Sequence, residues 1–140
     1  MYNPEELKQN KELIKLCKEF DLFLLVLFGS RAKGTSKKNS DFDFGFLSSK
    51  KLSPEKFIFL HEKFMNLLKF EKIDLIDLNS ASIFVKKNIF LSGILIYEKE
   101  KGIFFREKWN SWSDFVKFKP YYKIQKDILK KEINLMIQNG

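Results

Sequence analysis

Apolar and polar residues form blocks along this chain that alternate between the patterns of strands and helices. The unbroken apolar run Leu22–Phe28, bounded by Asp21 and Gly29, is typical of a buried strand. Shorter apolar runs predict further strands over Phe42–Leu47, Lys72–Leu78 and Ile94–Tyr97. Because helical patterns separate these strands, we expect an α/β (α+β) fold in which helices flank a mixed β-sheet.

Capping residues and helical spacing predict helices in the first two thirds of the chain. Asn3 and Pro4 start a helix that runs to about Phe20. Its apolar stripe is expected to contain Leu7, Ile14, Cys17 and Phe20. A second helix runs from Pro54 to about Lys69, and we expect it to bury Phe57, Ile58, Phe64, Met65 and Leu68. A third begins after Ser80 or Ser82, runs through Leu91 and ends at Gly93.

The C-terminal part of the sequence predicts two more helices after a turn over residues 98–102. The first spans about residues 103–118, with an aromatic stripe formed by Phe105, Trp109, Trp112 and Val116. Pro120 is expected to break it, and a final amphipathic helix then covers Tyr121–Gln138. Such a stripe is more often core or interface than a nucleobase platform, and aromatic residues are enriched at interfaces.

The stretch from Gly29 to Asp43 carries the chemistry. After the buried strand, Gly29 and Ser30 turn the chain into a short helix that Gly34 ends, and backbone N–H groups at such a turn suit phosphate oxygens. Asp41 and Asp43 lie two apart at the start of the next strand, so both carboxylates share a face. Like charges so close favour a cation between them, and Mg²⁺ prefers carboxylate oxygens. Either motif alone fits an ordinary turn or loop; together they favour phosphoryl or nucleotidyl transfer.

Gly29-Ser30, ten intervening residues and then Asp41-x-Asp43 resemble the signature of the DNA polymerase β-like nucleotidyltransferase superfamily. The chain's size and the Ser-Asp-x-Asp context are similar to its minimal nucleotidyltransferases (MNT), many of which are antitoxins paired with HEPN-domain ribonuclease toxins. The resemblance implies a polymerase β-like fold with the site on an open face of the sheet. It also implies that Gly29 and Ser30 hold the terminal phosphates of ATP. By their position next to this turn, Arg31 and Lys33 are the basic residues best placed to add positive charge there, although each alone is more often a solvated loop residue.

The resemblance further implies that Asp41 and Asp43 hold two Mg²⁺ ions and that a third carboxylate on a later strand completes the site. Asp74, between two apolar residues, is favoured for that role, whereas Asp77 faces the other side and ends its strand. His61 is expected to be an ordinary helix residue and not a general base. Gly45 lies on the same face of its strand as Asp43. Its lack of a side chain either leaves room for the substrate or allows a neighbouring residue to pack closely.

Composition narrows the partners only slightly. The 140 residues suit a single domain, with a core over about residues 1–100 and a helical extension over about 103–138. An ordinary lysine-covered surface accounts for the +8 charge better than a dedicated nucleic-acid site, since no RNA-binding motif accompanies the charge. A nucleotide, RNA or an acidic partner is the alternative, so direct nucleic-acid binding stays open. The single Cys17 excludes an intrachain disulfide, and the absence of a signal sequence or a long apolar segment leads us to expect a cytoplasmic protein without membrane contact.

By resemblance, the expected function is an antitoxin that transfers AMP from ATP to a tyrosine hydroxyl of a HEPN toxin, which is thereby neutralised (AMPylation). Two rivals remain open. A nucleotidyltransferase acting on a small molecule or an RNA end would label that acceptor without any toxin. A catalytically idle antitoxin would still neutralise its toxin after Asp41→Ala and Asp43→Ala.

Overall fold

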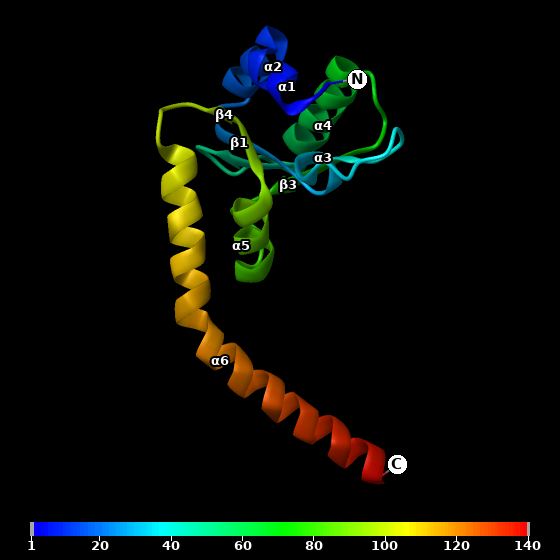
Figure 1. Ribbon diagram of the computed structural model, residues 1–140, viewed down its shortest axis with the longest axis vertical. Helices are drawn as coiled ribbons and strands as arrows, with labels where there is room; N and C mark the ends of the chain where they lie inside the picture. The colour runs from blue at the N-terminus through cyan, green and yellow to red at the C-terminus, as the bar shows by residue number, and fades with distance from the viewer. Residues whose placement is uncertain (1, 140) are drawn as a thin grey trace.

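The computed structural model describes residues 2–139, and within this range four strands form one sheet in the order β3-β2-β1-β4 (Figure 1). The strands are β1 (Leu22–Phe28), β2 (Phe42–Ser48), β3 (Ile73–Asp77) and β4 (Ile94–Glu98). The central strand β1 pairs antiparallel with β2 and β4, whereas β2 and β3 run parallel. The predicted mixed sheet flanked by helices is therefore confirmed.

The two faces of the sheet are covered by different helices. Every second residue of β2 from Phe42 to Phe46 is a buried phenylalanine on the face covered by α1, α2 and α4. Asp43, Gly45 and Leu47 alternate with them and so lie on the other face, where α5 and the start of α6 pack. The carboxylate of Asp43 thus shares its face with α5 and α6.

The N-terminal segment forms two helices instead of the single one expected. They are α1 (Pro4–Gln9) and α2 (Lys11–Glu19), and Asn10 between them has an extended backbone. The Asn10 side chain accepts a hydrogen bond from the backbone N–H of Leu13 at 3.0 Å and caps α2. Asparagine competes for backbone bonds in this way, which is why it interrupts a pattern that apolar spacing alone reads as continuous.

Helix α4 (Pro54–Leu68) starts at the predicted cap, Ser53, and packs on the sheet through Leu60, Phe64 and Leu68. The expectation that Ile58 is buried is wrong, since 59% of its surface is exposed. Phe57 already faces the core, and the next residue along a helix points about 100° away from it. Helix α5 (Ile83–Ser92) is capped by Ser82, whose side chain accepts from the backbone N–H of Val85.

The expected break at Pro120 is wrong, because α6 runs from Ile103 to Asn139 with Pro120 inside it. Proline removes one backbone hydrogen bond and crowds the preceding turn, which kinks a helix without having to end it. Figure 1 shows α6 changing direction in its middle part and then leaving the body of the molecule. No helix among the described residues combines the length and apolarity needed to cross a membrane.

Two sets of contacts fix the first half of α6 to the body. The carboxylate of Glu98 accepts from the backbone N–H groups of Gly102 and Phe104 at the start of the helix. Further along, the ring of Phe84 on α5 meets the rings of Phe115, Phe118 and Tyr122. The predicted aromatic stripe of α6 stays exposed, and three of its members line an apolar hollow of about 340 Å³ with Leu91 and Lys108: Phe105, Trp109 and Trp112.

Candidate active site

Three carboxylates converge at one end of the sheet. Asp43 and Asp74 are register partners across the parallel pair β2–β3, and Asp41 lies just before β2. Each offers a carboxylate oxygen, and these three oxygens all lie within 4.8 Å of one another. The structure therefore brings together the three acids that the sequence singled out, through a strand pairing that no local motif specifies.

Asp77 stands apart from this cluster. It is in register with Phe46, three residues farther along the strand pair than Asp74. Its Oδ1 accepts a hydrogen bond from the backbone N–H of Asn79 at 3.0 Å, in the turn that follows β3. Asp77 is thus a turn-capping residue, and the preference for Asp74 over Asp77 agrees with the geometry.

Gly29 lies directly against the acidic cluster. It precedes the short helix α3 (Ser30–Lys33) with φ 74° and ψ −157°, a backbone conformation that is essentially limited to glycine. A Cβ atom at this position would collide with the Asp43 carboxylate. The turn and the acid therefore touch only because residue 29 has no side chain. Gly29 is thus beside the carboxylates, as the motif predicted, and Ser30 follows it as the first residue of α3.

Arg31 holds the loop that leads to Asp41. Its Nε and Nη2 both donate to the backbone carbonyl of Ser40, at 3.0 and 2.6 Å. Its guanidinium carbon lies 3.9 Å from the centre of the Phe42 ring and 5.3 Å from that of Phe70. Burial lowers the pKa of Arg31, while Asp41 and then Asp43 oppose that shift. The side chain clamps the backbone next to Asp41 and adds positive charge beside the cluster.

The sequence did not reveal this clamp. Ser40 is a loop residue and Phe70 lies far along the chain, so only the fold joins them to Arg31. Lys33 is exposed in the last turn of α3, and its predicted contact with phosphate, like that of Arg31, stays a prediction. Lys37 also stabilises the loop, because its backbone N–H donates to Ser40 Oγ at 2.7 Å.

The electrostatics of the cluster fit a divalent cation. The pKa of Asp43 is raised from 3.8 to about 6, first by burial and then by the charges of Asp74 and Asp41, with a smaller opposing effect from Arg31. A carboxyl group in that position holds its charge poorly without a compensating cation. Three hard oxygen donors within reach of one another match the ligand preference of Mg²⁺.

Other candidate groups lie elsewhere. His61 on α4 faces the opposite side of the sheet, where Nε2 lies 2.6 Å from the carbonyl oxygen of Ile73; since a carbonyl only accepts, Nε2 is the donor. The expectation that His61 is not a general base agrees with this contact. Gly45 is a packing position, since a Cβ there would lie 2.8 Å from the Leu78 side chain.

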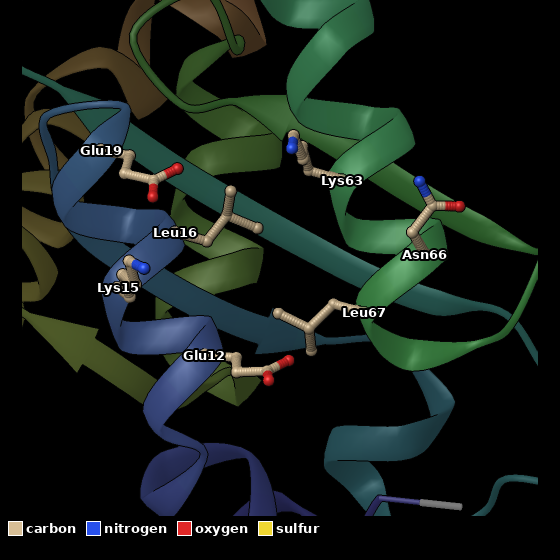
Figure 2. Close-up of a pocket in the computed structure, with 7 residues that line it drawn as sticks. All are labelled: Glu12, Lys15, Leu16, Glu19, Lys63, Asn66 and Leu67. Carbon is tan, nitrogen blue, oxygen red and sulfur yellow. The ribbon is translucent and has the colours of Figure 1, made fainter.

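A hollow of about 340 Å³ lies between α2 and α4, which cover the face of the sheet opposite to the carboxylates. Figure 2 shows Leu16 of α2 and Leu67 of α4 pointing into the gap between these helices. Glu12, Lys15 and Lys63 lie around them. This hollow offers mixed charges and no cluster of metal ligands, so the chemistry belongs to the other face.

Comparison with known proteins supports the same assignment. The profile of the polymerase beta nucleotidyltransferase family matches residues 11–102. No curated protein sequence matches the chain. A solved structure described as a toxin–antitoxin with AMP-PNP is 26% identical, has a TM-score of 0.70 and covers 84% of this chain and 96% of its own.

Two further solved structures share the fold at lower identity. A tri-AMPylated HEPN toxin from Shewanella oneidensis in complex with MNT antitoxin has a TM-score of 0.67 at 21% identity and covers 90% of this chain and 98% of its own. The toxin–antitoxin MntA-HepT has a TM-score of 0.67 at 22% identity and covers 89% of this chain and 98% of its own. The predicted resemblance is confirmed. Because the family profile spans well over half of the sequence, the chain belongs to the polymerase β nucleotidyltransferase family.

Proposed function

We propose that this protein is a Mg²⁺-dependent antitoxin that transfers AMP from ATP to a tyrosine hydroxyl of a HEPN toxin and thereby neutralises it. The observation that carries the proposal is the contact of the Gly29 turn with Asp43, inside a cluster of three carboxylates. An acidic cluster beside a tight glycine turn is the equipment that nucleotidyl transfer requires. Family membership gives this equipment its reaction class.

The relatives support the nucleotide and the partner. The toxin–antitoxin structure at 26% identity is described with AMP-PNP, an ATP analogue. The Shewanella complex, which shares the fold, contains a HEPN toxin that carries three AMP groups beside its MNT antitoxin. We carry over to this chain ATP as the donor, a HEPN toxin as the partner and AMP as the transferred group.

The residues of this chain divide the work. Asp41, Asp43 and Asp74 would hold Mg²⁺, which when bound stabilises the negative charge that develops on the phosphate oxygens. Gly29 and the backbone beside Ser30 would hold the terminal phosphates, because a side chain at residue 29 would fill that space. Arg31 positions Asp41 by holding the Ser40 carbonyl.

The proposed transfer is a nucleophilic displacement at the α-phosphorus of ATP. The tyrosine oxygen forms a bond to that phosphorus, the bond to the bridging oxygen breaks, and pyrophosphate leaves. We assign to Asp74 the role of accepting the tyrosine proton. Asp74 and Asp41 are the two exposed members of the cluster, whereas Asp43 is half-buried, so an incoming hydroxyl can reach Asp74. Arg31 contributes positive charge near the departing pyrophosphate.

Two of the three carboxylates are open to an acceptor presented by another molecule. Asp41 and Asp74 are exposed, and the second half of α6, the last helix of the described residues, leaves the body of the molecule (Figure 1). A hydroxyl presented by a docked protein therefore has open access. This exposure supports a protein acceptor, as proposed.

The proposal is tested by incubating the purified protein with its HEPN toxin, Mg²⁺ and ATP labelled either at the α- or at the γ-phosphate. We expect the toxin to retain the α-label only, and tandem mass spectrometry to locate AMP on tyrosine. Asp41→Asn and Asp43→Asn should abolish labelling while the fold is retained. If the wild-type protein leaves the toxin unlabelled and these variants still neutralise it, the protein is instead an antitoxin that acts by binding alone.

A further inference from the structure

The second half of α6 forms an exposed arm, residues 121–139, which we call the C-terminal arm. Every one of its residues is exposed, including large apolar side chains. These include Ile124, Ile128, Leu129, Ile133, Leu135 and Met136, with Met136 exposed over 73% of its surface. Isolated amphipathic helices of this length are marginal in water, so most of their stability comes from packing against a partner.

The apolar residues of the arm occupy a broad face. At about 100° per residue, they cover roughly half of the helix circumference, from Ile124 on one edge to Ile133 near the other. Lys123, Lys130 and Asn134 lie on the opposite side. A seam between two paired helices needs only a narrow stripe, whereas a face this wide fits a groove with two walls.

The arm has a fixed origin and a defined direction. Glu98 caps the start of α6, and the ring of Phe84 contacts Tyr122 at 4.6 Å between centroids, at the point where the arm begins. Figure 1 shows the arm projecting away from the sheet on the side where α5 lies. That is the same face of the sheet that carries Asp43 and Asp74.

We propose that the C-terminal arm docks into the protein substrate itself, the toxin whose hydroxyl receives AMP, and holds that hydroxyl at the carboxylates. This rests on the proposed function. The exposed site and the uncovered arm lie on one side of the sheet, so a single partner can contact both. Binding energy from a remote surface then turns the transfer into a reaction between groups that are already aligned.

The charges of the arm favour this occupant over a second copy of the chain. Four lysines outnumber two acids in the arm, and Lys126 and Lys131 border the two edges of its apolar face. Two copies would bring these lysines together, whereas a groove with an acidic rim would pair with them. The arm therefore fits a groove on a different protein, with an apolar floor and acidic residues along its two edges.

Glu132 adds a specific requirement. By its helical position it lies in the middle of the apolar face, beside Ile128 and Leu135. When docking buries this carboxylate, the loss of its hydration opposes binding unless the partner supplies a group that pairs with it. The groove of the toxin is therefore expected to present a basic or hydrogen-bond-donating group opposite Glu132, and this fixes the register of the arm.

The test compares Ile128→Asp, within the apolar face, with Asn134→Asp on the polar side. Both add the same charge to the same exposed helix, so helical content measured by circular dichroism should change equally. Calorimetric titration with the toxin should show affinity weakened by about 30-fold or more for Ile128→Asp only. Transfer by Ile128→Asp should recover at high toxin concentration, since its carboxylates are unchanged.

Different outcomes separate this inference from the proposed function. Asp43→Asn should bind the toxin like the wild type and transfer nothing. Full affinity of Ile128→Asp, with normal transfer, would overturn the docking inference and leave the nucleotidyltransferase intact. Failure of the wild type to transfer AMP would overturn the proposed function instead. A wild-type dimer in light scattering that Ile128→Asp dissociates would overturn the choice of occupant in favour of a second copy.

Discussion

Replacing Gly29 with alanine tests the contact on which the site depends. A methyl group at this position would overlap the Asp43 carboxylate, and the backbone holds φ at 74° with ψ at −157°. Either the turn moves away from the acid or Asp43 rotates out of the cluster. In both cases the Gly29 turn and the three carboxylates can no longer be adjacent.

The size of the effect follows from two contributions. Holding a residue other than glycine in this region of backbone conformation costs about 1–3 kcal/mol, which for a chain of this size lowers Tm by roughly 3–10 °C. Displacing a catalytic group by about 1 Å costs roughly 100-fold in rate. We therefore expect Gly29→Ala to lose modest stability and about 100-fold or more in AMP transfer.

Gly34→Ala is the matched control. Gly34 also has a positive φ of 75°, but no atom lies within 4 Å of the position its Cβ would take. Its substitution should cost about 1–2 kcal/mol of backbone strain and leave the cluster unchanged. Thermal denaturation measures the loss of stability. Titration with Mn²⁺, which stands in for Mg²⁺, and the kinetics of AMP transfer measure whether the cluster is unchanged.

The reasoning is refuted if Gly29→Ala and Gly34→Ala behave alike. Equal loss of stability with full transfer in both variants would mean that the turn need not touch Asp43. Conversely, loss of transfer in Gly34→Ala would show that strain in the loop, and not the collision with the carboxylate, controls the site.

Three other perturbations probe the site and the arm. Because the pKa of Asp43 is raised from 3.8 to about 6, the folded chain keeps a proton that the unfolded chain has lost between about pH 4 and 6, so this group makes the metal-free fold less stable as pH rises through that range. Comparing Tm across that range for the wild type and Asp43→Asn should show this decline only in the wild type, and Mg²⁺ should raise Tm above pH 6 only in the wild type. Arg31→Lys should weaken Mn²⁺ binding about 10-fold, because lysine cannot make both bonds to Ser40 while stacking on a ring; unchanged Mn²⁺ affinity with weaker ATP binding would indicate a phosphate ligand instead. Pro120→Ala should straighten α6 and weaken toxin binding through the altered direction of the arm, which spin-label distances between the body and the arm would reveal; an unchanged distance would mean that proline does not set the bend.

The sequence was informative where chemistry and local structure coincide. The alternation of β2 places Asp41 and Asp43 on the face opposite Phe42, so the pair was readable from spacing alone. The glycine before α3 was equally readable as a turn. Its collision with Asp43 was not, because that contact depends on the antiparallel register of Phe28 with Asp43.

Residues that depend on long-range pairing were harder to assign. Asp74 joins the cluster because β3 pairs parallel with β2, and spacing left Asp77 as a competitor. The sequence predicted that Arg31 lies beside the bound phosphates. Nothing in it indicated that Ser40 and Phe70 would contact the side chain. Such assignments need the pairing of strands, which is a property of the whole chain.

Helix boundaries failed where one residue has two physically allowed outcomes. Asn10 either stays within a helix or caps a new one, and its bond to Leu13 selects the second. Pro120 either ends a helix or bends it, and in α6 it bends it. Both choices are decided by competing interactions of similar size that an apolar pattern does not contain.

The intact mass of the HEPN toxin co-expressed with this protein tests the central claim most directly. We predict a toxin heavier by whole AMP units when it is purified with the wild type, and an unmodified toxin when it is purified with Asp43→Ala. An unmodified toxin from the wild-type pair, in cells that contain ATP and Mg²⁺, would contradict the claim that Asp41, Asp43 and Asp74 form a nucleotidyl-transfer site.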